Sequence, residues 1–313
     1  MGRAARGKAT SGVTATKTAT ATKAARSRPD SARLKAAHLR AAQRRTQVRR
    51  RLLAAGAGVA VVVVFVAALV GVSLSHSGAA AVASPQAPKT DAQVAAKLAS
   101  VPAAAFNSVG AGSATGLKAL SGAPELTANG HPEILYVGGE FCPFCAAERW
   151  ALAAALSRFG TLSGLHFIHS SPTDGDIPTL SFYKSGYSSK YLSFAPVEWY
   201  GEADDPSTPF GHVYLQQPTA QEAALFDRYA NGSLPFVDIA NRYLLPEAQY
   251  SPEDLSGLSW AQIAAAMQDP SSQVARDIDG AANSLTAAIC KVTNGQPGGV
   301  CTSAGVKAAA GSV

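Results

Sequence analysis

The stretch Glu133–Trp150, EILYVGGEFCPFCAAERW, decides the fold of this 313-residue chain. Its apolar head, Ile134–Val137, is made of strand formers and meets the pair Gly138-Gly139. An Ala/Leu-rich segment at helical spacing follows and runs from Ala146 to Phe159. The order predicts a strand, a turn and a helix.

Two cysteines lie at the predicted turn. Cys142 and Cys145 have C-x-x-C spacing, which puts Cys142 at the exposed first turn of the helix and Cys145 one turn inside it, within disulfide reach. Pro143 suits the first helical position, where a missing N–H costs nothing. Because unpaired N–H groups and the helix dipole favour a thiolate, we expect a lowered Cys142 pKa and a reactive dithiol.

These residues resemble the active site of the thioredoxin superfamily. The stretch GGEFCPFCAAERWALAAALSRFG is similar, more closely, to a family of uncharacterised membrane-anchored prokaryotic proteins with a thioredoxin-like domain. The resemblance runs from about Ala92 to Cys301 and includes SLPFVDIANRYLL at Ser233–Leu245. It implies an α/β fold with a thioredoxin-like central sheet flanked by helices, and with an insertion before the strand that a cis-proline opens.

By this resemblance Pro235 is the cis-proline that faces the cysteines, and the backbone of Leu234 pairs with a substrate peptide. A proline heading the apolar run Phe236–Ile239 fits, because a central strand tolerates proline only at its first residue. An ordinary turn proline is the alternative. Three residues around the motif are also expected to contact substrate: Phe141, Pro143 and Phe144.

Charge divides the chain into a basic tail and an acidic remainder. Residues 1–51 carry fifteen Lys or Arg and one acid, Asp30, whereas the rest has twelve basic and twenty acidic residues. Between them, Leu52–Leu74 is a run of 23 uncharged residues, about 34 Å long as a helix and enough to span a bilayer. We expect one transmembrane helix, with the basic side in the cytoplasm and the remainder outside.

The alternative to a membrane anchor is a cleaved signal peptide, for which Ala81-Val82-Ala83 would be the cleavage site. The tail 1–51 is expected to be disordered and to touch anionic headgroups. A DNA-binding tail is the alternative, but no nucleic-acid partner is expected. We expect a linker at 75–91, the exported domain at 92–304 and a disordered end at 305–313.

All four cysteines then lie in the exported part, where disulfides persist. We expect Cys142–Cys145 to be the catalytic pair and Cys290–Cys301 a structural disulfide on the last helix. In a second account the C-terminal pair relays electrons to the site, and in a third all four hold zinc. Zinc is disfavoured because ten residues separate Cys290 from Cys301. Neither a metal nor a cofactor is expected.

A group must also move the proton of Cys145. In thioredoxins a buried Asp six residues before the first cysteine does this, and here that position is Tyr136. Glu140 and Glu148 are the available carboxylates, and Glu148, one turn beyond Cys145, is the predicted catalytic residue. A solvent-facing charge is the alternative for Glu140, and an ion pair with Arg149 for Glu148.

Further elements are predicted from pattern alone. Leu165–His169 reads as a second strand parallel to the first, and residues 101–130 as loop with one short strand. The aromatic residues of 170–200 are core or half-buried, with a peptide-binding groove as the alternative. Helices are expected at three places: Ala92–Ser100, Ala220–Tyr229 and within Ser251–Lys291.

The sequence therefore predicts a membrane-anchored thiol–disulfide oxidoreductase acting on exported cysteine-containing proteins, with an oxidase or isomerase favoured by the location. A membrane quinone-linked disulfide oxidoreductase would regenerate it. The alternative is a non-catalytic thioredoxin-like module that binds a partner or a metal. A copper site would need a nearby histidine, and the candidates are His166, His169 and His212.

Overall fold

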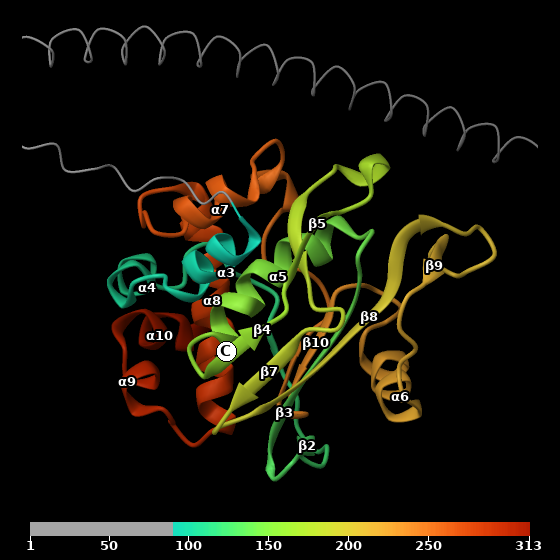
Figure 1. The fold of residues 1–313 in the computed structure, drawn as a ribbon. Coiled ribbons are helices and arrows are strands. Elements are labelled where there is room, and N and C mark those ends of the chain that lie inside the picture. The colour runs from blue at the N-terminus through green and yellow to red at the C-terminus, as the bar shows by residue number, and fades with distance from the viewer. Residues whose placement is uncertain (1–89) are drawn as a thin grey trace, which may run out of the picture. The chain divides into compact units, whose positions relative to one another are not determined.

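The computed structural model describes residues 90–313, and strand β3 (His131–Gly139) lies in the middle of their largest sheet (Figure 1). The last six residues of β3 are all buried, because side chains cover the sheet on both sides. Tyr136 packs in the cluster on one face and Val137 in the cluster on the other, as the alternation of a strand requires. The apolar run predicted from sequence is therefore a central strand.

Seven strands form this main sheet, which is mixed parallel and antiparallel. Besides β3 it contains β1 (Lys118–Ala119), β2 (Thr127–Ala128), β8 (Ser193–Asp204), β9 (His212–Tyr214), β10 (Phe236–Ile239) and β11 (Tyr243–Leu245). Their order is β1-β11-β10-β3-β8-β9, and β2 pairs with the start of β3. Strand β8 is parallel to β3, whereas β10 is antiparallel to β3 and β11 is antiparallel to β10.

Helices cover both faces of the sheet. On one face α5 (Pro143–Leu156) packs beside the long α8 (Gln273–Val292), and their side chains make up much of the main hydrophobic cluster. On the other face α6 (Ala220–Tyr229) packs through Phe226 against Phe236 of β10. The described residues thus form an α/β fold with a central mixed sheet packed against helices.

Shorter helices complete the domain. They are α3 (Asp91–Ala99), α4 (Ala103–Val109), η2 (Pro252–Leu255), α7 (Trp260–Ala266), α9 (Gly298–Cys301), α10 (Ala304–Ala309) and η3 (Ala310–Ser312). The helices predicted at Ala92–Ser100 and Ala220–Tyr229 are confirmed as α3 and α6. Ser251 opens only the short turn η2, and the next helix begins after a second cap, Ser259.

The prediction that Leu165–His169 is the parallel neighbour of β3 is wrong. These residues form β5 (His166–His169), which pairs antiparallel with β6 (Pro178–Ser181) in a separate two-stranded sheet. The parallel partner is β8, whose twelve residues run beside the nine of β3 and bury Val197 and Tyr200. A short apolar run between two turns does not reveal which strand it will pair with.

The residues between α5 and β8 form an insertion that packs on α5. It consists of β4 (Gly160–Ser163), β5, η1 (Pro172–Asp174), β6 and β7 (Gly186–Ser189). The indole of Trp150 donates a hydrogen bond to the carbonyl of Pro178 at 3.0 Å, and the hydroxyl of Thr179 donates to that of Ala146 at 2.8 Å. The insertion therefore buttresses the helix that follows the cysteine motif.

Two segments for which no helix was predicted contain helices. Residues 101–130 contain α4, and residues 305–313, expected to be disordered, contribute α10 and η3. Val306 and Ala309 are buried, and a β-carbon on Gly305 would meet the carbonyl oxygen of Phe106 at 2.3 Å. These small residues let α10 approach α4 and α8 closely, a packing that an Ala/Gly-rich composition does not reveal.

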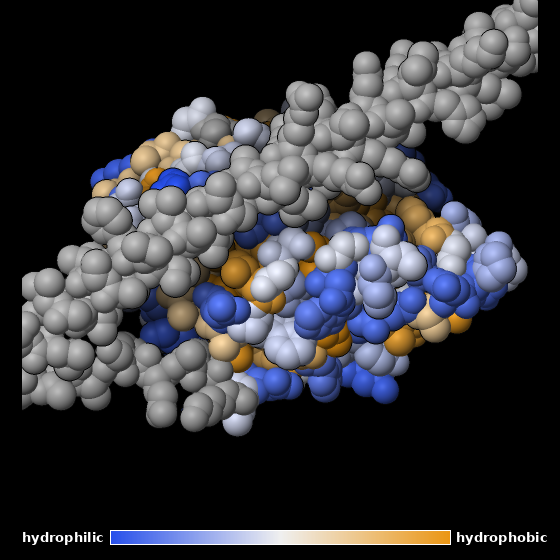
Figure 2. Space-filling view, turned by 90° about the horizontal axis from the view of Figure 1, so that it is seen from above, coloured by the Kyte–Doolittle hydropathy of each residue, from blue (hydrophilic) through white to orange (hydrophobic). Residues whose placement is uncertain are grey.

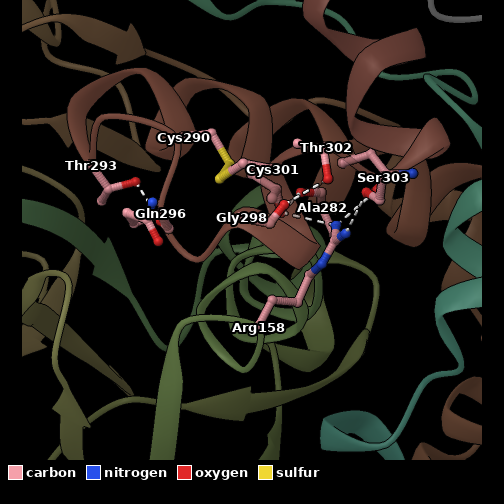
Figure 3. Close-up of a disulfide and its surroundings, with 11 residues drawn as sticks. Arg158, Ala282, Cys290, Thr293, Gln296, Gly298, Cys301, Thr302 and Ser303 are labelled. Carbon is pink, nitrogen blue, oxygen red and sulfur yellow. Dashed lines mark hydrogen bonds between the residues drawn. A yellow bond between two sulfur atoms is a disulfide. The ribbon is translucent and has the colours of Figure 1, made fainter.

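The predicted disulfide between Cys290 and Cys301 is present and joins the end of α8 to α9 (Figure 3). Nearby, Arg158 reaches over from the segment after α5 and donates to Asn283 of α8 at 2.8 Å and to Ser303 at 3.4 Å. The disulfide and Arg158 both hold the segment that begins with α9 against α8.

Segments 1–51 and 52–74 and nearly all of the predicted linker lie outside the described residues. Within residues 90–313, no helix is long and apolar enough to cross a membrane. Figure 2 looks down on the end of the domain that carries α7, and the described atoms in view are small hydrophobic groups interspersed with hydrophilic ones.

Candidate functional site

The cysteine motif lies where β3 passes into α5. Cys142 is the N-cap of α5, and its sulfur accepts a hydrogen bond from the backbone N–H of Cys145 at 3.2 Å. Pro143 occupies the first turn of the helix, as the sequence predicted. Cys142 is only 5% exposed, so the prediction that it lies at an exposed turn is wrong; aromatic rings and Leu234 cover it.

The two thiols are free, and their surroundings shift their pKa values in opposite directions. The pKa of Cys142 is lowered, chiefly by a hydrogen bond with the Cys145 thiol and further by backbone N–H groups and the Arg149 charge, against the effect of burial. The pKa of Cys145 is raised well above its ordinary value, because the side chain is fully buried and lies beside Cys142. Cys142 is the thiol suited to nucleophilic attack, and Cys145 is the buried partner.

The predicted cis-proline segment faces Cys142 across the site. The Leu234–Pro235 peptide bond is cis, and the Cys142 thiol donates to the carbonyl oxygen of Leu234 at 3.8 Å. Strand β10 begins directly afterwards, with Phe236 opposite Val137 of β3. The pairing of β10 with β3 thus brings together two segments that are about ninety residues apart in the sequence.

Aromatic rings from β8, β9 and the loop between them enclose the motif. The Phe141 ring stacks on the imidazole of His212, with centroids 3.9 Å apart and planes 12° apart. Tyr200 and Phe210 also contact Phe141, and Tyr214 contacts Tyr200. Part of the aromatic segment predicted as core therefore lines the site.

Two large apolar side chains remain open to solvent among the described residues. Phe144, inside the C-x-x-C motif, is 51% exposed, and Tyr214 of β9 is 48% exposed. Of the four residues expected to contact substrate, Phe141 is buried, Pro143 and Leu234 are half-buried and Phe144 projects outward. Phe144 is thus the most accessible apolar contact at the motif.

The glycine pair before the motif has a steric role that the sequence did not disclose. A β-carbon on Gly138 would lie 2.0 Å from the hydroxyl oxygen of Tyr136, and one on Gly139 would lie 2.7 Å from the Phe141 ring. The missing side chains make room for the Tyr136 hydroxyl and the Phe141 ring against the backbone.

The predicted proton-transfer residue Glu148 is directed elsewhere. Its carboxylate is fully buried and accepts a hydrogen bond from the backbone N–H of Gln249 at 3.1 Å, and burial raises its pKa to about 8. In the described part of the chain it makes no hydrogen bond to either cysteine, and it does not pair with Arg149. Glu140 is half-buried rather than solvent-facing and accepts from the Ser181 hydroxyl at 2.6 Å.

Sequence reasoning missed a buried ion pair beside the cysteines. Arg149 and Glu198 are both fully buried, and the guanidinium donates to the two carboxylate oxygens at 2.9 and 2.7 Å. Arg149 also donates to the carbonyl of Gly139 at 2.7 Å. The available signal was that Glu198 is the only charged residue in the stretch 193–201, which otherwise reads as an apolar strand.

Of the three histidines proposed as metal ligands, His166 is exposed at the start of β5 and the other two have partners of their own. His169 contacts the carboxylate of Asp176 at 3.0 Å, and His212 is stacked on Phe141. Within residues 90–313 there is no group of three or more His, Cys, Asp or Glu side chains that could hold a metal ion.

Comparison with other proteins identifies the family. Neither the curated proteins nor the solved structures contain a match to this chain. Among protein families, residues 120–291 match a domain of unknown function, DUF929, and the matched region includes Cys142, Cys145, Glu198 and Pro235. Because the match spans more than half of the 313 residues, the chain belongs to the DUF929 family.

Proposed function

We propose that this protein is a membrane-anchored thiol–disulfide oxidoreductase that acts on exported cysteine-containing proteins. The observation that carries the proposal is the pair of free thiols at the start of α5. Cys142 accepts a backbone N–H at the N-cap and has a lowered pKa, whereas Cys145 is buried with a raised pKa. This asymmetry supports a division into an attacking thiolate and a resolving thiol.

The topology supports a thioredoxin-like reading of the fold. The order β3-α5-β8-α6-β10-β11-α8, with β8 parallel and β10 antiparallel to β3, is the arrangement that the resemblance implies. The cysteines at the β3–α5 turn and the cis Leu234–Pro235 bond beside them agree with it. The insertion lies between α5 and β8, ahead of the cis-proline strand.

The proposed chemistry is a thiolate exchange in two steps. The Cys142 thiolate attacks one sulfur of a substrate disulfide, the S–S bond breaks, and the other substrate sulfur leaves as a thiolate that takes up a proton from water. Cys145 then gives up its proton to water, and its thiolate attacks the Cys142 sulfur. The bond between Cys142 and the substrate breaks, the Cys142–Cys145 disulfide forms, and the substrate's first sulfur leaves as a thiolate that takes up a proton. In the reverse direction, the oxidised pair delivers a disulfide to a substrate dithiol.

An exported position favours the oxidising or isomerising direction. The inferred anchor at 52–74 and the basic tail before it support that position. As an oxidase, the protein needs its pair reoxidised after each cycle, and a membrane quinone-linked disulfide oxidoreductase is the class of partner that would do so.

The test is a redox titration of the full chain in detergent. The protein is equilibrated with glutathione buffers, free thiols are alkylated, and the state of Cys142–Cys145 is read by mass, with Cys142→Ser as control. An oxidase or isomerase should show a midpoint between about −120 and −180 mV. A midpoint near −270 mV would make the protein a reductant. If the pair does not exchange under native conditions, the proposal is overturned. The alternative function, a non-catalytic binding module, would then take its place.

A further inference from the structure

The insertion makes several hydrogen bonds to the redox motif. The N–H of Ser171 donates to the carbonyl of Phe141 at 2.8 Å, and the hydroxyl of Ser181 donates to Glu140 at 2.6 Å. The N–H of Phe182 donates to Glu198 at 3.0 Å. These donors all lie between His166 and Phe182, a stretch that is called the β5–β6 segment below. The β5–β6 segment thus holds both the loop before the cysteines and the acid of the buried ion pair.

Arg149 connects this support to the cysteines. It lies four residues after Cys145 on α5, so both side chains project from the same face of the helix. Its guanidinium is fixed by two hydrogen bonds to Glu198 and one to the carbonyl of Gly139. The same carbonyl accepts the backbone N–H of Cys142 at 3.1 Å. One nitrogen of the guanidinium, Nη1, is buried and has no hydrogen-bond partner among residues 90–313.

A positive charge beside Cys145 favours the resolving step. Cys145 must become a thiolate in a fully buried environment, where an isolated anion is strongly disfavoured. Glu148 accepts from the N–H of Gln249 instead, and the buried Tyr136 hydroxyl has no hydrogen-bond partner in the part of the chain that the structure describes. Burial and the neighbouring Cys142 raise the pKa of Cys145, and the charge of Arg149 opposes that rise; the same charge helps to lower the pKa of Cys142, which agrees with the position of Arg149 on the shared helix face.

Resting on the proposed function, we infer that Arg149 is the positioning residue of the resolving step: held by Glu198 and the β5–β6 segment, it stabilises the Cys145 thiolate. The titratable or charged groups around it are Cys142, Tyr136 of β3, Glu198 of β8 and Glu140 of the loop. Glu198 partly neutralises the guanidinium, so the pair sets how readily Cys145 ionises.

The experiment follows the two halves of the exchange separately. The full chain in detergent, with its Cys142–Cys145 pair reduced, is mixed with the aromatic disulfide dithiobis-nitrobenzoate. Attack by Cys142 releases one coloured thiolate and leaves a mixed disulfide. Attack by Cys145 on the Cys142 sulfur then releases the second thiolate. Cys145→Ser should show the first release only, so the second release and its pH midpoint report on Cys145.

Three variants test the inference. The double variant Arg149→Met/Glu198→Leu removes the ion pair without leaving a buried lone charge. It should slow the second release about tenfold at neutral pH and raise its pH midpoint by about one unit. Arg149→Lys, which keeps the charge, should retain most of the rate. Glu198→Gln, which leaves the cation less neutralised, should lower the midpoint, an effect opposite in sign to that of the double variant.

Arg158→Met is the matched control, because Arg158 lies just beyond the other end of α5 and contacts Asn283. It should leave the second release unchanged. The inference is overturned if the folded double variant keeps the wild-type rate and midpoint, or if Glu198→Gln, shown to be folded, fails to lower the midpoint. These failures differ from failure of the proposed function, in which the wild type itself gives no second release.

Discussion

The hydroxyl of Tyr136 occupies the space beside Gly138 that a β-carbon would fill, with only 2.0 Å between that oxygen and the ideal β-carbon position. Tyr136 is fully buried, and no described residue forms a hydrogen bond with its hydroxyl. A tyrosine and a glycine two residues apart on β3 are therefore sterically coupled directly before the cysteine motif.

Gly138→Ala should destabilise the protein by about 3 kcal/mol, because the new methyl group overpacks a strand position with no room. Tyr136→Leu in the same chain should recover part of this loss, since it removes the atoms that clash. Urea unfolding of the two single variants and the double variant gives the coupling energy. Strictly additive effects would contradict the steric account.

Stability should fall as pH rises from about 5 to about 8. Burial raises the pKa of Glu148 and that of Asp279 to about 8, so the folded protein holds protons that the unfolded chain has released. This stabilisation is complete below the unfolded pKa values and is lost as pH rises through the folded ones, at up to about 1.4 kcal/mol per pH unit for each group.

Glu148→Gln keeps an acceptor for the Gln249 N–H but cannot ionise, and it should flatten the pH dependence over this range. Exposed Glu247 supplies the matched control, Glu247→Gln. Thermal unfolding between pH 5 and 8 checks the prediction. If Glu148→Gln and the control behave alike, the burial of an ionisable Glu148 does not govern the stability.

Replacing Cys290 and Cys301 together by Ala should lower stability by about 3 kcal/mol, because the disulfide closes an eleven-residue separation that the unfolded chain would otherwise explore. The measurement is the urea midpoint. Thiol exchange at Cys142 should persist in this variant if the disulfide is structural. Loss of turnover with unchanged exchange at Cys142 would instead support the electron relay.

Phe144→Ala should weaken exchange with peptide disulfides about tenfold while leaving exchange with glutathione nearly unchanged, because the exposed ring offers apolar contact that only a larger substrate can use. Phe144→Leu keeps an apolar side chain and is the matched control. Neither change should alter stability by more than about 0.5 kcal/mol. Equal losses with peptide and glutathione would assign Phe144 to the motif's own geometry instead.

The local sequence determined the strand, turn and helix around Cys142 and Cys145, because an apolar run, two glycines and an N1 proline act over a few residues. It also determined α6, whose capping box from Thr219 to Glu222 is a local signal. The disulfide between Cys290 and Cys301 was expected because the C-x-x-C motif claims the other two cysteines and an exported domain keeps disulfides, and the structure contains it.

Only the tertiary structure decided which segments meet. Whether β5 or β8 pairs with β3 depends on competition between strands far apart in the chain, which periodicity does not encode. Glu148 and Arg149 are neighbours on one helix, yet one faces Gln249 and the other Glu198. Helix periodicity separates their directions and puts Arg149 on the same face as Cys145, but the strand and loop that receive the two side chains come from distant sequence, so the partner of each charge is decided by the fold.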